Sequence, residues 1–315
     1  MPKVSRTEAK PEPKADGGAG RSIAHTVRDH MRAIVGGLLV GLPLLWTQEM
    51  WDRGSTLPPL KLLLLLAVAF GIVVGFNAVS GFRRERSLLE LLLDSLQGLG
   101  LSVLIAAAAL VILGRLEPEH GIGPMVGRIV LESIPVAFGT ALATTALSES
   151  EDSGGREAVG PIGHLFVAAG GALYFALNIA PTDEVRVLGS ESATPLLLIA
   201  MMASLTMGLA TLLVLKRPTG PRSWIGNGPL DGPIGETIAA YAVALLISFL
   251  LLWSFDIVQG LGFRALVGHV VMLSIVAAFG AGAGRLLVGD GSDADASDAN
   301  ASDANASDAA VPVGA

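Results

Sequence analysis

The sequence predicts an all-α fold, a polytopic bundle of about eight transmembrane helices. Hydrophobic residues make up 51% of the 315 residues and charged residues only 16%, which leaves more apolar surface than a water-soluble domain can bury. The apolar residues fall in continuous runs of about 20, the helix length that crosses a hydrocarbon layer of about 30 Å. Because these runs lack the period-two alternation of lipid-facing strands, a β-barrel is disfavoured.

Eight apolar runs define the expected helices. They cover about residues 31–51, 60–80, 91–113, 124–147, 161–181, 193–215, 234–256 and 263–288. Each break between them carries proline, glycine or charge, the residue types that interrupt helices. Since the connections are short, consecutive helices should be antiparallel, within one transmembrane domain over residues 22–288.

The two ends of the chain have the composition of disordered tails. Residues 1–21 are polar and rich in lysine, proline and glycine, so they cannot bury enough apolar area to offset the entropy of ordering. Residues 289–315 repeat a short acidic unit of low complexity. Such a tail suits a halophilic protein in very salty surroundings, because carboxylates hold water. The alternative is a solvated tail with no environmental meaning.

The orientation follows from the basic residues, which concentrate on the cytoplasmic side of membrane proteins. With an even number of helices, one side receives most of them. These are the basic residues of the N-terminal segment, Arg83, Arg84, Arg86, Arg156, Lys216, Arg217, Arg222 and Arg285. We therefore expect a multi-pass protein of the cell membrane with both termini in the cytoplasm.

Two stretches of the sequence repeat without gaps. GRIVLESIPVAFG (127–139) and GHVVMLSIVAAFG (268–280) match at seven positions, at an offset of 141 residues. At an offset of 135, Gly36 and the sequence TQE that follows Trp46 fall on Gly171 and TDE. This predicts a 4+4 internal repeat of parallel halves, as in some transporters. Convergent small-residue composition at helix contacts is the alternative.

Ionisable and polar residues in or beside the apolar runs are the candidate site residues, because a charge buried in lipid is costly unless it is paired or hydrated. In the expected orientation they lie toward the outer leaflet and could line a polar vestibule for a cation or a proton. They are Glu49, Arg128, Glu132, Asn178, Asp183, Glu184 and His269.

Salt bridging at helix ends is the structural alternative for each of these residues. Glu132 is the strongest functional candidate, since it lies about two turns inside its helix and three residues before Pro135. That proline leaves a backbone carbonyl without its helical donor and can bend the helix beside a cavity.

Several classes of function are excluded or disfavoured. The chain has no cysteine, so disulfides, thiolate catalysis and Cys-ligated metals are excluded. No hydrolase, metalloprotease, kinase or phosphate-loop motif is present, and no basic nucleic-acid-binding face is indicated. We expect no enzyme activity, no cofactor and no metal site.

Three segments resemble those of a known family. LPLLWTQEMW (42–51), ALNIAPTDE (176–184) and the stretch from Gly260 to Leu287 are similar to an uncharacterised bacterial and archaeal family of integral membrane proteins. The likeness covers about residues 28–288 and implies a multi-pass protein. It carries no known catalytic or binding residues, but it points to Glu49, Pro181 and Glu184 at helix ends.

Together these features favour a transporter or channel-like protein for an ion or small solute, with the lipid bilayer as its surroundings. A non-transporting membrane scaffold or accessory subunit is the alternative, in which the same charges pair in a dry bundle. The two hypotheses differ in whether water reaches the buried charges.

Overall fold

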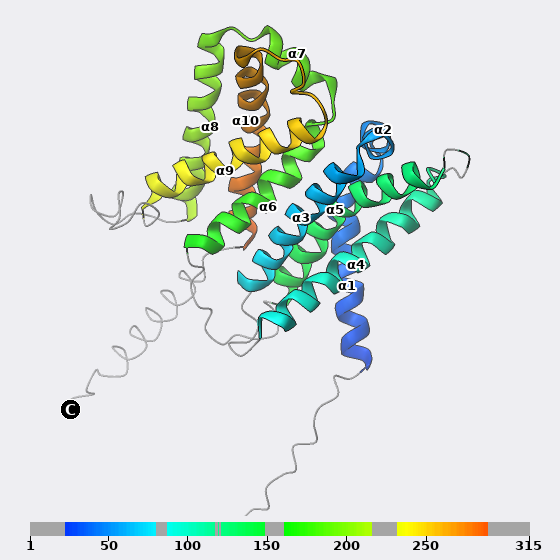
Figure 1. The fold of residues 1–315 in the computed structure, drawn as a ribbon. Helices are drawn as coiled ribbons and strands as arrows, with labels where there is room; N and C mark the ends of the chain where they lie inside the picture. Colours follow the sequence, from blue (N-terminus) through cyan, green and yellow to red (C-terminus); the bar gives the residue numbers. More distant parts are fainter. Residues whose placement is uncertain are drawn as a thin grey trace, which may run out of the picture.

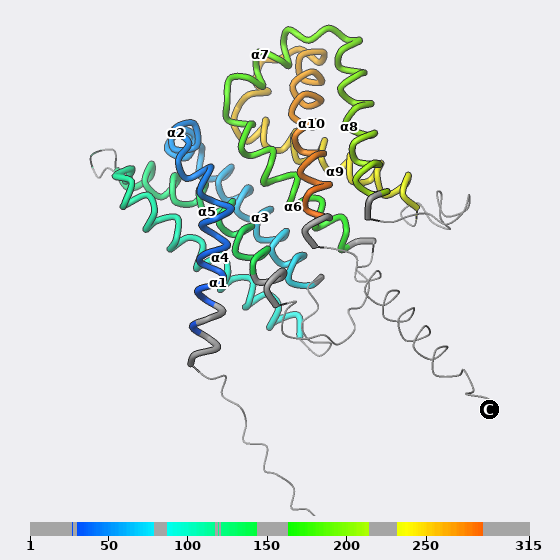
Figure 2. Tube along the Cα trace, turned by 180° about the vertical axis from the view of Figure 1, so that it is seen from behind, coloured from blue at the N-terminus to red at the C-terminus, as the bar shows by residue number. Residues whose placement is uncertain are grey.

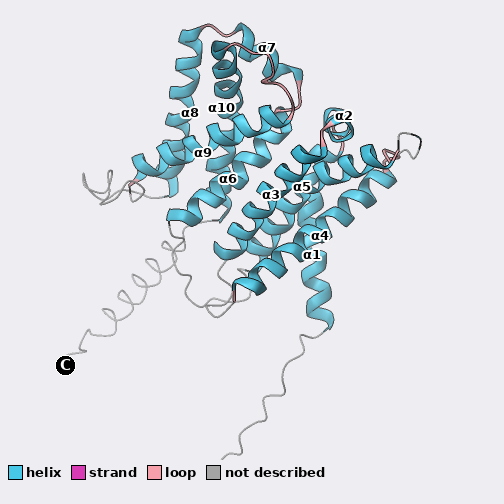
Figure 3. Ribbon diagram, in the orientation of Figure 1, coloured by secondary structure: helices cyan, strands magenta, loops and turns pink. Residues whose placement is uncertain are grey.

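The structure is a computed structural model that describes residues 23–79, 87–116, 119, 121–148, 161–215 and 232–288. Within these residues it is all-helical, with ten α-helices and no strand (Figure 3). Both predicted tails lie outside this part of the chain. So do the basic residues between positions 80 and 86, 149 and 160, and 216 and 231, on which much of the orientation prediction depends.

The helices form two groups in chain order, which lie side by side in Figure 1. The first group contains α1 (Ile23–Leu45), α2 (Gln48–Thr56), α3 (Pro59–Val79), α4 (Leu88–Ile112) and α5 (Ile122–Ser148). The second group contains α6 (Pro161–Ile179), α7 (Asp183–Glu191), α8 (Thr194–Leu215), α9 (Pro233–Ser254) and α10 (Phe263–Val288). We call these groups the first and second halves.

By length and apolar composition, the described helices provide six to eight candidate membrane spans. Six of them, α3, α4, α5, α8, α9 and α10, are long and apolar enough to cross a bilayer alone. Two bent pairs, α1 with α2 and α6 with α7, raise the number to eight if each pair is one span. The predicted number of about eight helices matches the upper value.

Two predicted helices are broken near their ends. The run 31–51 is predicted to be one helix, but α1 ends at Leu45 and α2 continues from Gln48 at a bend of 87°. The run 161–181 ends at Ile179, and residues expected to form a loop make α7 at a bend of 94°. Figure 2 shows α2 and α7 at the same end of their respective halves.

The same local chemistry starts α2 and α7. Thr47 and Thr182 have extended backbone conformations directly before the new helices, a position where threonine is favoured. Acidic residues follow in both first turns, where they interact favourably with the positive end of the helix dipole. Helical propensity therefore resumes at the break, but along a different axis.

Close helix contacts depend on glycine. A Cβ atom on Gly280 of α10 would lie 2.3 Å from the carbonyl oxygen of Gly171 on α6. Only a residue without a side chain lets the two backbones come so near, which is the usual role of small residues between membrane helices.

A row of aromatic rings crosses the contact between the halves. Phe76, Phe138, Tyr174, Phe175 and Phe279 follow one another with ring centroids 5.3–5.5 Å apart, which is the separation of interacting aromatic pairs. The Tyr174 hydroxyl also donates a hydrogen bond to the Val40 carbonyl at 2.9 Å. The middle of the molecule is thus held by apolar packing between α3, α5, α6 and α10, with one polar contact to α1.

The close contact between α6 and α10 predicts opposite effects for two glycine-to-alanine changes. We expect Gly280→Ala to lower the melting temperature in detergent, because overpacking costs about 1–3 kcal/mol. Gly98→Ala on α4 is the control, since a Cβ atom added at Gly98 would have nothing within 4 Å and alanine favours a helix over glycine by about 1 kcal/mol. A Gly280→Ala protein as stable as the wild type would contradict the close approach.

Candidate functional site

The seven predicted site residues are divided between the halves. Glu49, Arg128 and Glu132 belong to α2 and α5, whereas Asn178, Asp183, Glu184 and His269 belong to α6, α7 and α10. Among the described residues, no hydrogen bond or ion pair joins any two of the seven. A common vestibule that all seven line stays a prediction.

Arg128 is bound to backbone carbonyls. Its Nε donates to the Trp51 carbonyl at 3.2 Å, and one terminal nitrogen donates to the Arg115 carbonyl at 2.5 Å. The Arg115 guanidinium in turn lies 4.1 Å from the centre of the Trp51 ring, a cation–π contact. Arg128 therefore fastens α2 and the connection after α4 to the start of α5.

Glu132 is fully buried, with 0% of its surface exposed. Neither carboxyl oxygen has a hydrogen-bond partner. Helical spacing puts it on the face of α5 that carries Arg128 one turn before and Val136 one turn after, and Val136 packs with Leu45 and Ile105. Glu132 is thus a buried acid on α5, one turn from Arg128, which binds α2, and one turn from Val136, which packs on α1 and α4.

The other acids of the predicted set are at the surface. Glu49, Asp183 and Glu184 are all exposed on the short helices α2 and α7. The Asp183 side chain lies 3.9 Å from Arg186 on the next turn, a contact that contributes little at this exposure. These three acids are placed to meet solvent or lipid headgroups.

The two remaining residues make contacts within their own helices. The Asn178 amide donates to the Tyr174 carbonyl at 2.7 Å. His269 is 2% exposed, and its Nδ1 lies 2.6 Å from the Ala265 carbonyl. His269 also touches α7, because a Cβ on Gly189 would fall 2.7 Å from the His269 Cα.

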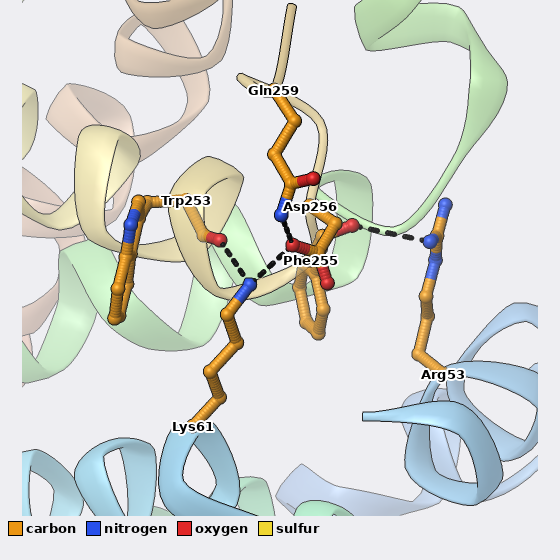
Figure 4. A network of polar contacts seen from close by, with 6 residues as sticks. All are labelled: Arg53, Lys61, Trp253, Phe255, Asp256 and Gln259. Atoms are coloured by element: carbon orange, nitrogen blue, oxygen red, sulfur yellow. Dashed lines mark hydrogen bonds and ion pairs between the residues drawn. The ribbon is translucent and has the colours of Figure 1, made fainter. Parts of the chain in front are cut away.

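A polar network that the sequence did not reveal joins the halves (Figure 4). Lys61 at the start of α3 pairs with the Asp256 carboxylate and donates to the Trp253 carbonyl at 3.0 Å. Arg53 on α2 donates to the Phe255 carbonyl at 3.2 Å. Two basic residues of the first half thus hold the turn that ends α9.

Backbone conformation places the Asp256 carboxylate in this network. Asp256 has a φ of 60°, a left-handed conformation that ends helices and that aspartate tolerates better than most residues. Gln259 also donates to the same carboxylate. The charges of Lys61 and Asp256 could be read from the sequence, but their pairing across 195 positions could not.

A second pair missed by the sequence lies inside the second half. The Arg285 guanidinium is 3.3 Å from the Glu236 carboxylate, and both side chains are only 5–6% exposed. Beside Arg285 is a cavity of about 10 Å³, close to the space that one water molecule requires. Its lining includes the hydroxyl-bearing residues Ser204, Thr211, Thr237 and Tyr241. In the sequence, this pair is indicated only by one charge near the start of α9 and one near the end of α10, which runs antiparallel to α9.

Within the described residues, no three histidine, aspartate or glutamate side chains are grouped so that they could hold a metal ion.

Long apolar helices, glycine contacts and sparse buried charges define a polytopic α-helical membrane protein. The chain belongs to the family described as "Putative integral membrane protein (DUF2391)", whose model matches residues 29–288. The resemblance expected from the three sequence segments is thereby confirmed. No curated protein and no solved structure matches the chain.

The buried pair between α9 and α10 predicts a strong stability effect. Glu236→Leu should destabilise the protein by about 3–5 kcal/mol, because it leaves the buried Arg285 charge without its carboxylate. The double variant Glu236→Leu/Arg285→Met should recover much of this loss, since it removes both charges together. Thermal unfolding in detergent measures both, and equal melting temperatures for the two variants would contradict the interpretation.

Proposed function

We propose that the protein is a small-solute or ion transporter, or a channel-like protein, built from two related halves in the cell membrane. The observation that carries this proposal is the buried Glu132, an acid without a hydrogen-bond partner inside a membrane span. Ionisable groups within membrane helices commonly mark pathways for ions or protons. Its partners would be the lipid bilayer and the transported ion or solute.

The order of helices supports an internal 4+4 repeat as part of this proposal. Each half begins with a helix that bends sharply into a short acidic helix, by 87° in one and 94° in the other. Three long helices follow in both halves. Parallel repeats of this kind occur in transporters, where the halves move against each other.

Glycine contacts support the repeat independently of helix order. In the first half, a Cβ on Gly127 would lie 2.0 Å from the Gly54 carbonyl oxygen, and in the second, a Cβ on Gly268 would lie 2.2 Å from the Gly189 carbonyl oxygen. Gly54 and Gly189 are separated by 135 residues, and Gly127 and Gly268 by 141. These are the offsets of the sequence matches.

The ends of α4 and α9 are also alike. Gly114 and Asp256, each the second residue after its helix, have φ values of 66° and 60°. The next residue donates back in each case, Arg115 to the Leu110 carbonyl at 2.8 Å and Ile257 to the Leu252 carbonyl at 2.9 Å. This six-to-one hydrogen bond is that of the Schellman motif, which ends a helix with one residue in the left-handed conformation.

A scaffold or accessory subunit is the second candidate, and one observation favours it. Arg53, Arg128 and Arg264 all donate to backbone carbonyls of neighbouring segments. Charges used in this way fasten helix ends and need no substrate. A scaffold gives no reason, however, for an acid with no partner at Glu132.

The transporter proposal predicts flux through purified protein in liposomes. Wild-type protein should conduct protons, a cation or a small solute from a broad panel, and Glu132→Gln should reduce the rate about tenfold or more, a barrier change of about 1.4 kcal/mol. The amide cannot take up or release a proton or balance a cation. Fluorescent indicators inside the liposomes measure the flux.

Glu90→Gln is the matched control, because Glu90 is exposed in the first turn of α4 and should leave the rate unchanged. Absence of flux over the whole panel would favour the scaffold. Flux that is equal in the wild type and Glu132→Gln would remove Glu132 from the pathway.

Eight spans, the number obtained if each bent pair crosses the membrane once, would place both termini on one side, which we propose is the cytoplasm. Reporter tags at the two ends should both be protected from impermeant reagents in intact cells and become labelled after permeabilisation. Tags found on opposite sides would require an odd number of crossings.

The acidic composition after residue 288 supports high-salt surroundings as a further part of this proposal.

A further inference from the structure

Among the residues that the structure describes, two glutamates are buried, and their surroundings differ. Glu236 has the Arg285 guanidinium 3.3 Å away, so its negative charge is compensated. Glu132 is also buried, but both of its oxygens are without a hydrogen bond. An ionised carboxylate without donors is very unfavourable in an apolar interior, and the neutral acid much less so.

The side chains nearest to Glu132 along its face are apolar or already engaged. Val136, one turn on, packs with Leu45, Ile105 and Ala106. Arg128, one turn back, directs its guanidinium to the Trp51 and Arg115 carbonyls. The guanidinium that could have compensated Glu132 therefore serves the backbone of α2 and of the connection after α4.

Other charged groups belong to the elements that pack on α5 at the end of the bundle where α2 lies. They are Glu49, Asp52 and Arg53 on α2, Lys61 on α3, and Arg115 and Glu119 between α4 and α5, whereas α1 has no charged residue between Ala33 and Leu45. Lys61 and Arg53 are bound to the turn after α9, and the acids Glu49, Asp52 and Glu119 are exposed. None of these groups bonds to the Glu132 carboxyl.

Packing alone does not require an acid at this position. At the offset of 141 residues, Glu132 of α5 corresponds to Leu273 of α10, and Leu273 is buried at 1% exposure. An apolar side chain fills the matching place in the second half. The carboxyl group of Glu132 thus needs an explanation other than the filling of space.

We propose that Glu132 is a proton-binding site, a carboxyl group that is neutral while α2 covers it and that exchanges its proton when α2 moves. α2 is placed to control access, because it follows the bend at Leu45 and rests on α5 through Gly54 and Gly127. The Trp51 indole closes the bend by donating to the Leu45 carbonyl at 3.0 Å.

Release breaks the carboxyl O–H bond and leaves its electron pair on the oxygen, while the proton passes to an entering water molecule. The side of the membrane on which α2 lies supplies that water. Any role of this proton in transport rests on the proposed function. The inference adds that the ion bound at Glu132 is a proton.

Infrared difference spectroscopy of the purified protein in lipid tests the site directly. At neutral pH, the wild type minus Glu132→Gln spectrum should contain the C=O stretching band of one protonated carboxylic acid, shifted in heavy water. The corresponding difference for Glu236→Gln should contain a carboxylate band instead, because Glu236 is paired with Arg285. A carboxylate band in the Glu132 difference would overturn the proposal.

Two further measurements exclude misfolding of the variant and binding of a metal cation as explanations of the spectra. Glu132→Leu should elute as a single species with a melting temperature no lower than that of the wild type, as expected where the acid has no structural partner. Sodium or potassium added at constant pH should leave the acid band unchanged. Loss of the band on addition of either ion would identify a metal-cation site and overturn proton binding.

The two proposals fail in different ways. Protein that shows the acid band but no flux in liposomes would retain the proton site and lose the transporter function. Protein that transports equally well with glutamate or glutamine at position 132, and shows no acid band, would lose the proton site alone.

Discussion

Inside a bilayer every backbone N–H and C=O group must find its hydrogen-bond partner within the protein, and this constraint governs where the helices can break. The break between α1 and α2 leaves carbonyls without helical donors. Thr47 donates to the Pro43 carbonyl at 2.7 Å, and Trp51 donates to the Leu45 carbonyl at 3.0 Å. At the second break, the Ile179 carbonyl accepts hydrogen bonds from both the N–H group and the hydroxyl of Thr182, at 3.0 and 2.8 Å. Side chains replace the missing donors at the first break, and backbone and side chain share this role at the second, so both helices can bend without leaving these carbonyls unpaired.

The buried ionisable groups differ in whether they have a partner, and a group without one is costly to bury. Arg285 and Glu236 compensate each other between α10 and α9, with hydroxyl-bearing side chains and a small cavity beside them. Arg128 satisfies two carbonyls. Each of these charged groups binds a partner within the protein, so a structural role is enough to account for it. Glu132 has no such explanation, and a group that is costly to bury without a partner is retained more readily where its ionisation is used.

The sequence predicted the helices well where the signal was continuous hydrophobicity, as in α3, α8 and α9. It failed at Trp46 and Thr47, because the apolar residues Met50 and Trp51 follow the short polar segment 47–49 and extend the predicted helix past the change of axis. Thr182 followed by two acids carries the same helix-start signal, although the polar composition there predicts a loop. The partners of Lys61 and Glu236 could not be predicted, since they depend on how the helices pack in space. Glu132 was identified from its depth in the helix and from the proline three residues after it.

Two differences between the halves affect how the molecule is held together and where it carries a buried charge. The turn after α4 has Gly114 in the left-handed conformation, which needs no side chain, whereas the turn after α9 has Asp256 in nearly the same conformation. That aspartate supplies the carboxylate that Lys61 of the other half binds, so the departure from glycine joins the halves on the side of α2. The second difference is at Glu132, which corresponds to Leu273 in the repeat that we propose. One departure therefore ties the halves together and the other adds an ionisable group to only one of them. In the repeat and the transport function that we propose, two identical halves would surround a transported ion in the same way twice, whereas here the buried acid belongs only to the half in which Arg128 binds α2.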